Sequence, residues 1–105
     1  MSVERTSGSV FAALGYEDSE EMERKSELVS AISETIRAKG LSQVEAARIV
    51  NLDQPTLSKL LRGRTRSISM DKLTAILNAL GRDVTIIVGR MPADGAKGRT
   101  LVEVR

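Results

Sequence analysis

Apolar side chains follow a helical period through most of the chain and a shorter, strand-like period near its end. Between Met22 and Ile36, aliphatic residues recur three or four positions apart with charged residues between them. Asp18 or Ser19 can cap the start of this helix, where several glutamates lie at the positive end of the helix dipole. Gly40 provides a stop. The pattern predicts one long amphipathic helix.

Two short helices are predicted next. Ser42 and Glu45 have the spacing of a capping box, in which each side chain accepts a backbone N–H at the helix start. Asn51 then interrupts the apolar pattern and can adopt a left-handed conformation, while Asp53 can cap a second short helix that ends at Gly63. Only three residues separate the two helices, which is the outline of a helix-turn-helix unit.

The remainder of the chain combines one more helix with a change of period. Ser69 can cap a fourth helix with leucine and isoleucine at helical spacing, which Gly81 ends. The β-branched run at residues 83–88 is predicted to be a strand, and residues 100–104 alternate enough to form a second one, so that the pair can make a hairpin. Whether residues 99–105 form that strand is left open.

The predicted elements divide the chain into three segments. Residues 1–17 are predicted to be an N-terminal arm, residues 18–81 a helix-turn-helix domain, and residues 82–105 a C-terminal segment with one or two strands.

Composition narrows the range of functions. The chain has 105 residues, no cysteine and no histidine, which excludes disulfides, thiol nucleophiles, imidazole bases and the usual zinc sites. No apolar run approaches the roughly 18 residues of a membrane helix. We therefore expect a cytoplasmic protein that is not an enzyme and needs no cofactor or metal.

The net charge of +2 conceals a separation of charge along the chain. Residues 1–36 contain three basic and eight acidic side chains, whereas residues 37–105 contain thirteen basic and six acidic ones. A polyanion is attracted by the second part and repelled by the first. Charge alone is equally compatible with a solvated acidic helix and scattered surface arginines.

The stretch from Leu41 to Gly63 closely resembles the DNA-binding domain of the Cro and phage-repressor-like (XRE) family. The resemblance extends over about Leu28 to Gly81, roughly half of the chain. Asn51 departs from the glycine usual at that position, although asparagine tolerates the same positive φ. The resemblance implies a mainly α, lambda-repressor-like helical bundle that binds double-stranded DNA.

The family's binding mode assigns roles to individual residues, because its second helix enters the major groove. The residues expected at base edges are Gln54, Pro55, Thr56 and Lys59. Those expected to contact the DNA backbone are Gln43, Ser58, Arg62, Arg64 and Arg66. A glutamine amide matches adenine and a lysine can donate to guanine, whereas Leu57, Leu60 and Leu61 are expected in the core.

The C-terminal strand predicts an assembly. An isolated strand leaves Val84, Ile86 and Val88 without cover, and antiparallel pairing with a second chain would cover them. A two-fold axis could then set two recognition helices about 34 to 36 Å apart, which suits a palindromic operator. The predicted state is a homodimer.

Residues within and beside the unit narrow the resemblance to HigA-type antitoxins and their stand-alone relatives, which repress their own operon. These residues are Ser9 to Gly15, Asp53 to Pro55 with Leu60 to Gly63, and Leu80 to Val84. The resemblance implies a RelE/HigB-type toxin, a small mRNA endonuclease, as a partner. Val10, Phe11 and Leu14 would meet that toxin or pack inside the molecule. The alternatives are a stand-alone repressor without a toxin, and a protein-interaction module that only neutralises a partner.

Overall fold

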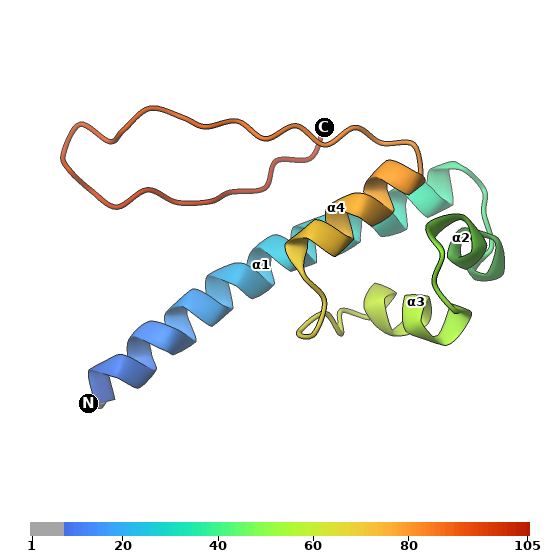
Figure 1. Ribbon diagram of the computed structural model, residues 1–105, viewed down its shortest axis with the longest axis horizontal. Helices are drawn as coiled ribbons and strands as arrows, with labels where there is room; N and C mark the ends of the chain where they lie inside the picture. The colour runs from blue at the N-terminus through green and yellow to red at the C-terminus, as the bar shows by residue number, and fades with distance from the viewer. Residues whose placement is uncertain (1–7) are drawn as a thin grey trace.

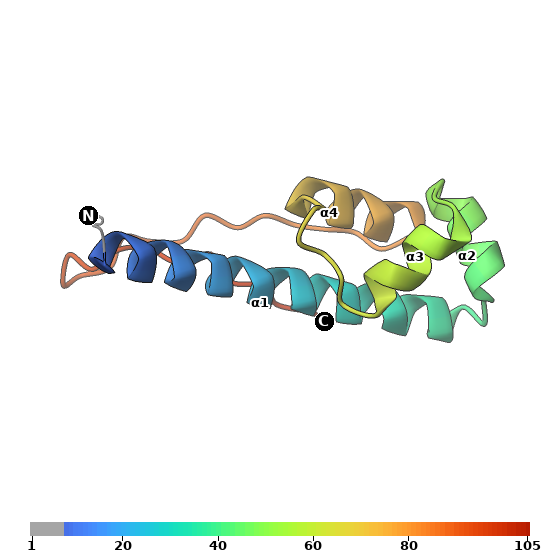
Figure 2. The ribbon, with the colours of Figure 1, turned by 90° about the horizontal axis from the view of Figure 1, so that it is seen from below.

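The molecule is built from one long helix and three short helices gathered along its carboxyl half (Figure 1). The computed structural model describes the backbone of residues 8–105 and the side chains from residue 19 onward. The helices are α1 (Gly8–Ala38), α2 (Gln43–Val50), α3 (Gln54–Leu61) and α4 (Met70–Ala79). Helix α1 packs against α3 and α4, and α2 packs against the same two helices (Figure 2). Among the described residues, no helix has the length and apolarity to cross a membrane.

The α2–turn–α3 unit has the local geometry that the sequence predicts. The Ser42 hydroxyl accepts the Glu45 N–H at 3.1 Å and the Glu45 carboxylate accepts the Ser42 N–H at 2.9 Å, which confirms the capping box. Asn51 lies in the left-handed region at φ 60°, and Asp53 accepts the Thr56 N–H at 2.8 Å. Both caps are satisfied by neighbours in the sequence, so the turn is fixed locally.

Helix α4 also begins and ends where the sequence indicates. The Ser69 hydroxyl accepts the Lys72 N–H at 3.1 Å at its start. Gly40, Gly63 and Gly81, the three glycines predicted to stop helices, all have positive φ. Residues with a Cβ rarely adopt that conformation, so glycine suits these positions.

Aliphatic side chains from all four helices form the core. Leu57 and Leu60 of α3 are completely buried, and Leu61 is partly buried against the same cluster. The other main contributors are Leu28, Ile32, Ile36, Ala46, Ala47, Val50, Leu73, Ile76, Leu77 and Leu80. The predicted core face of α3 is therefore confirmed, and Gln54, Pro55, Thr56 and Lys59 of the same helix are exposed.

Helix α1 begins earlier than predicted. It starts at Gly8 rather than at a cap on Asp18 or Ser19. Residues 8–18 contain no proline, and alanine, leucine and glutamate there favour a continuous helix, so capping residues inside the run do not interrupt it. The side chains of Val10, Phe11 and Leu14 lie outside the described residues.

The predicted C-terminal strands are wrong for the described chain. Residues 82–105 contain no strand; they run out along α1 and return toward it as an extended loop (Figure 1). The residues assigned to dimerisation are not paired, since Ile86 is 86% and Val88 92% exposed, and Val84 is also exposed. A β-branched run forms a strand only when another strand accepts its backbone hydrogen bonds, and no segment of the described chain does so.

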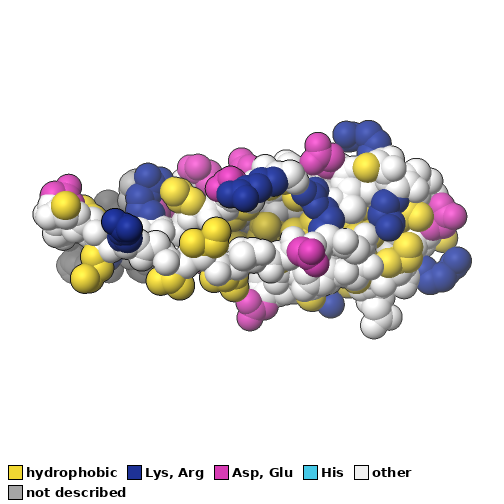
Figure 3. All heavy atoms as spheres, turned by 90° about the horizontal axis from the view of Figure 1, so that it is seen from above, with side chains coloured by type: hydrophobic (Ala, Val, Ile, Leu, Met, Phe, Trp, Pro, Cys, Tyr) yellow, Lys and Arg dark blue, Asp and Glu magenta, His cyan; other side chains and the backbone are white. Residues whose placement is uncertain are grey.

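The returning arm of this loop does contact the body. Val102 packs against the core, and residues 99–102 lie beside the acidic face of α1 near Glu20 and Glu27. Arg82 donates to the Arg105 carbonyl and to the Thr35 hydroxyl, which ties the two ends of the segment to α1. Hydrophobic side chains are nevertheless scattered over the surface of the face that carries this segment (Figure 3).

Candidate nucleic-acid interface

The first turn of α3 is exposed and rigidly anchored. Gln54, Pro55 and Thr56 are all solvent-exposed, and Asp53 caps the helix immediately before them. Hydrogen bonds from the Thr56 side chain, and then from its backbone N–H, hold the pKa of Asp53 below its ordinary value. The carboxylate therefore stays ionised to a lower pH than an unperturbed aspartate would.

One hydrogen bond joins the two helices of the unit through their first residues. Gln54 Nε2 donates to Gln43 Oε1 at 2.8 Å, and both side chains are exposed. The sequence pattern predicts separate roles for these glutamines and does not indicate the contact between them. No local signal in the sequence indicated this contact, because it joins residues 11 positions apart that the packing of α2 against α3 brings together.

The rest of α3 separates polar from apolar side chains as predicted. Lys59 is exposed and Ser58 is half-buried, while Leu57 and Leu60 lie in the core. Lys59 follows Pro55 by four residues, so the two share one face of the helix. A basic side chain therefore extends the exposed surface that begins at Gln54.

The loop after α3 continues this surface with three arginines. Arg62, Arg64 and Arg66 are exposed, whereas Thr65 between them is 2% exposed. The backbone N–H groups of Arg62 and Arg64 both donate to the Lys59 carbonyl at 3.1 Å. The end of α3 and the arginine loop, residues 62–67, are thus one connected structure rather than separate features.

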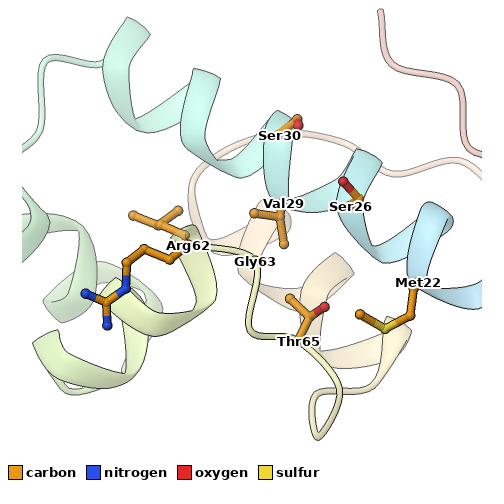
Figure 4. Close-up of a pocket in the computed structure, with 8 residues that line it drawn as sticks. Met22, Ser26, Val29, Ser30, Arg62, Gly63 and Thr65 are labelled. Atoms are coloured by element: carbon orange, nitrogen blue, oxygen red, sulfur yellow. The ribbon is translucent and has the colours of Figure 1, made fainter.

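A shallow cavity of about 380 Å³ lies behind the arginine loop, against α1. Met22 and Val29 line it from α1, and Thr65 faces them from the loop, while the Arg62 side chain extends away along α3 (Figure 4). Within the described part of the chain, no group of three acidic, cysteine or histidine residues is placed to hold a metal ion. The exposed side chains of this region include the amide of Gln54 and the basic groups of Lys59 and the loop arginines.

The chain is similar to known helix-turn-helix proteins in both sequence and structure. A protein family described as a helix-turn-helix domain matches residues 10–89. A solved structure whose name assigns it to the XRE family of transcriptional regulators is 33% identical, with a TM-score of 0.76, over 84% of this chain and 99% of that one. A search of curated proteins found no match.

Proposed function

The chain belongs to the XRE family of helix-turn-helix transcriptional regulators, and we propose that it reads its DNA target through the first turn of α3. Its helix-turn-helix unit makes it a DNA-binding regulator of a class that is typically not enzymatic. The proposal concerns which side chains meet the bases, which meet the phosphates, and how two copies sit on an operator.

The observation that carries the base assignment is the hydrogen bond between the two glutamines. Because Gln54 donates one amide hydrogen to Gln43, its side-chain oxygen and its second amide hydrogen remain available to a base. In the major groove, adenine offers N6 as a donor and N7 as an acceptor, which complements this pair. Gln43 holds the reading amide in place and keeps its own nitrogen for a phosphate.

Two neighbours of Gln54 complete the reading surface. Lys59 can donate to guanine O6 or N7 from the same helix face as Pro55. The exposed Thr56 side chain carries a methyl group that, together with Pro55, can contact a thymine methyl. Polar and apolar contacts are thus available side by side.

Phosphate contacts are assigned to residues on either side of this turn. They are Gln43 at the start of α2, Ser58 in α3, and the arginine-loop residues Arg62, Arg64 and Arg66. Phosphate contacts set the register of the protein on the duplex without selecting the sequence. Acting together, they would make binding strongly dependent on salt.

We further propose that the regulator is a cytoplasmic homodimeric repressor that occludes a promoter. The exposed residues Ile86, Ile87 and Val88 support association of two copies through the C-terminal segment, because contiguous exposed apolar side chains favour burial. Two copies would suit a palindromic site. Sedimentation of Ile87→Asp tests this: we expect the variant to shift toward monomer, and a monomeric native chain at all concentrations would contradict the dimer.

The base assignment is tested by selecting bound duplexes from a random pool and measuring affinities by fluorescence anisotropy. Gln54→Ala and Lys59→Ala should each lose about 1–3 kcal/mol of discrimination at one position of the site. Arg64→Ala should weaken selected and scrambled duplexes equally and reduce the salt dependence. Unchanged sequence preference in both α3 variants would reject the assignment.

The antitoxin role and the RelE/HigB-type partner stay predictions of the resemblance, as does a role limited to neutralising a partner. The side chains assigned to toxin contact, Val10, Phe11 and Leu14, lie outside the described residues. Co-expression with the product of the adjacent reading frame, followed by purification through one tagged chain, would test a toxin directly.

A further inference from the structure

A lysine is buried in the middle of α1, on the side that faces the arginine loop. Lys25 is 3% exposed, although charged side chains are almost never fully buried without partners. Removing an ammonium group from water is unfavourable unless its hydrogen bonds are replaced. The sequence pattern shows Lys25 only as one of the charged residues between apolar positions, so its burial is a finding of the structure.

Three acceptors replace the water around this ammonium group. Lys25 Nζ lies 3.2 Å from the Thr65 carbonyl, 3.5 Å from the Arg66 carbonyl and 3.1 Å from Glu21 Oε2, one turn earlier on α1. An ammonium group has three N–H donors, so every donor has an acceptor. Glu21 is half-exposed, which places the pair at the edge of the core.

The two carbonyls belong to the loop that carries the arginines. The Thr65 carbonyl also accepts the Ile68 N–H at 3.0 Å, so it joins α1 to the turn that leads into α4. Thr65 points toward Met22 and Val29 of α1 (Figure 4), and the arginines on both sides of it are exposed. Lys25 therefore binds the backbone of the arginine loop where the loop packs against α1, while the side chains of the loop arginines are exposed.

We propose that Lys25 is a positioning residue for DNA binding: it fixes the backbone of the arginine loop in the shape that presents Arg62, Arg64 and Arg66 to phosphates. This inference rests on the proposed function. Lys25 is itself buried and its ammonium group is surrounded by protein acceptors, so its effect on DNA binding passes through the loop. A loop ordered before binding loses less conformational freedom on the duplex, which raises affinity without adding a contact.

The test compares Lys25→Met with Glu21→Gln and with the native full-length chain. Methionine keeps an unbranched, buried side chain but removes all three N–H donors. Glutamine at position 21 removes one carboxylate and leaves both carbonyl contacts of Lys25. Binding is measured by anisotropy over a salt series, using one duplex from the selected pool and one scrambled duplex of equal length.

We expect Lys25→Met to weaken binding to both duplexes by about tenfold, to lower the salt slope by about one, and to leave the ratio between the duplexes unchanged. Glu21→Gln should change affinity less than threefold. A folded Lys25→Met with native affinity and salt slope would overturn the inference. Loss of the ratio between duplexes would do the same, because it would show that α3 had moved.

A measurement on the native protein covers the case in which Lys25→Met does not fold. Backbone ¹⁵N relaxation should show residues 62–68 as rigid as α3 before DNA is added, with order parameters of about 0.85. A loop that is mobile when free and ordered only on DNA would overturn the inference. Absence of salt-dependent binding by the native chain would instead reject the proposed function, and this inference with it.

Discussion

The helix-turn-helix unit and the C-terminal segment both contain several aliphatic residues, but these are buried in the unit and mostly exposed in the segment. In the unit, Leu57 and Leu60 are fully buried, whereas in the segment Ile86 and Val88 are almost fully exposed. Helices form their backbone hydrogen bonds within themselves and need a neighbour only for their apolar stripe. A strand needs a partner for its backbone as well, and the described chain supplies none.

The contrast shows which apolar side chains are buried within one chain and which remain exposed. In the unit, residues close in sequence cap both helices, and polar side chains are exposed at the start of α3. The segment attaches through Arg82 and Val102, while the apolar residues between them remain exposed. A second copy of the chain is the partner that we propose for them.

The largest expected effect is in the core. Leu60→Ala should lower the free energy of unfolding by about 2–5 kcal/mol, because it removes a fully buried side chain and leaves a cavity. Ile87→Ala, the matched change in the C-terminal segment, should stay within about 0.5 kcal/mol for the monomer. Urea denaturation at low protein concentration measures both. Similar losses in the two variants would abolish the distinction between the regions.

A smaller effect is expected at the turn between α2 and α3. Asn51 has φ 60°, a conformation that costs an ordinary L-residue about 1–2 kcal/mol. Asn51→Ala should therefore destabilise the protein by about 1 kcal/mol, while Asn51→Gly should be close to neutral. The two midpoints of thermal unfolding give the comparison, and equal stability of the two variants would show that the left-handed turn is not required.

The smallest effect concerns pH and is confined to the caps. Hydrogen bonds from Thr56 lower the pKa of Asp53, and the Ser42 N–H, followed by its hydroxyl, lowers that of Glu45. Since the folded state binds these protons less tightly than the unfolded chain, the stabilisation is complete above the ordinary values of 3.8 and 4.5 and is lost as pH falls through the lower folded values.

Asp53→Asn keeps a helix cap at this position but removes the carboxyl group that titrates. Asparagine caps a helix about as well as aspartate but binds no proton in this range. Urea unfolding from neutral pH to about pH 3 should show a shallower acid loss for the variant than for the native chain. An identical pH dependence would mean that Asp53 does not contribute to it.

The helical unit could be predicted from the sequence because its boundaries are set by residues close to them. Ser42, Asn51, Asp53 and Ser69 each satisfy backbone groups within a few positions, so their roles are visible without a structure. The start of α1 was misplaced because a cap-forming residue within a favourable helical run does not end it. The strands were wrong because pairing depends on segments that local patterning does not specify.

In the candidate site too, features set by neighbouring residues could be predicted and contacts between distant residues could not. The exposure of Gln54, Lys59 and the loop arginines follows from their positions beside a buried leucine face. The contact of Gln54 with Gln43 and that of Lys25 with the loop join residues 11 and about 40 positions apart. Tertiary packing alone brings such pairs together, so no local pattern could establish them.

The central claim is that the start of α3 and the arginine loop form one DNA-binding surface, and amide NMR during titration with a selected duplex tests it most directly. We predict that the largest shift changes fall on Gln43, on residues 54–59 and on residues 62–66, with little change on α1 or on residues 89–98. Changes concentrated on α1 or on the C-terminal segment, with residues 54–59 unaffected, would contradict the account.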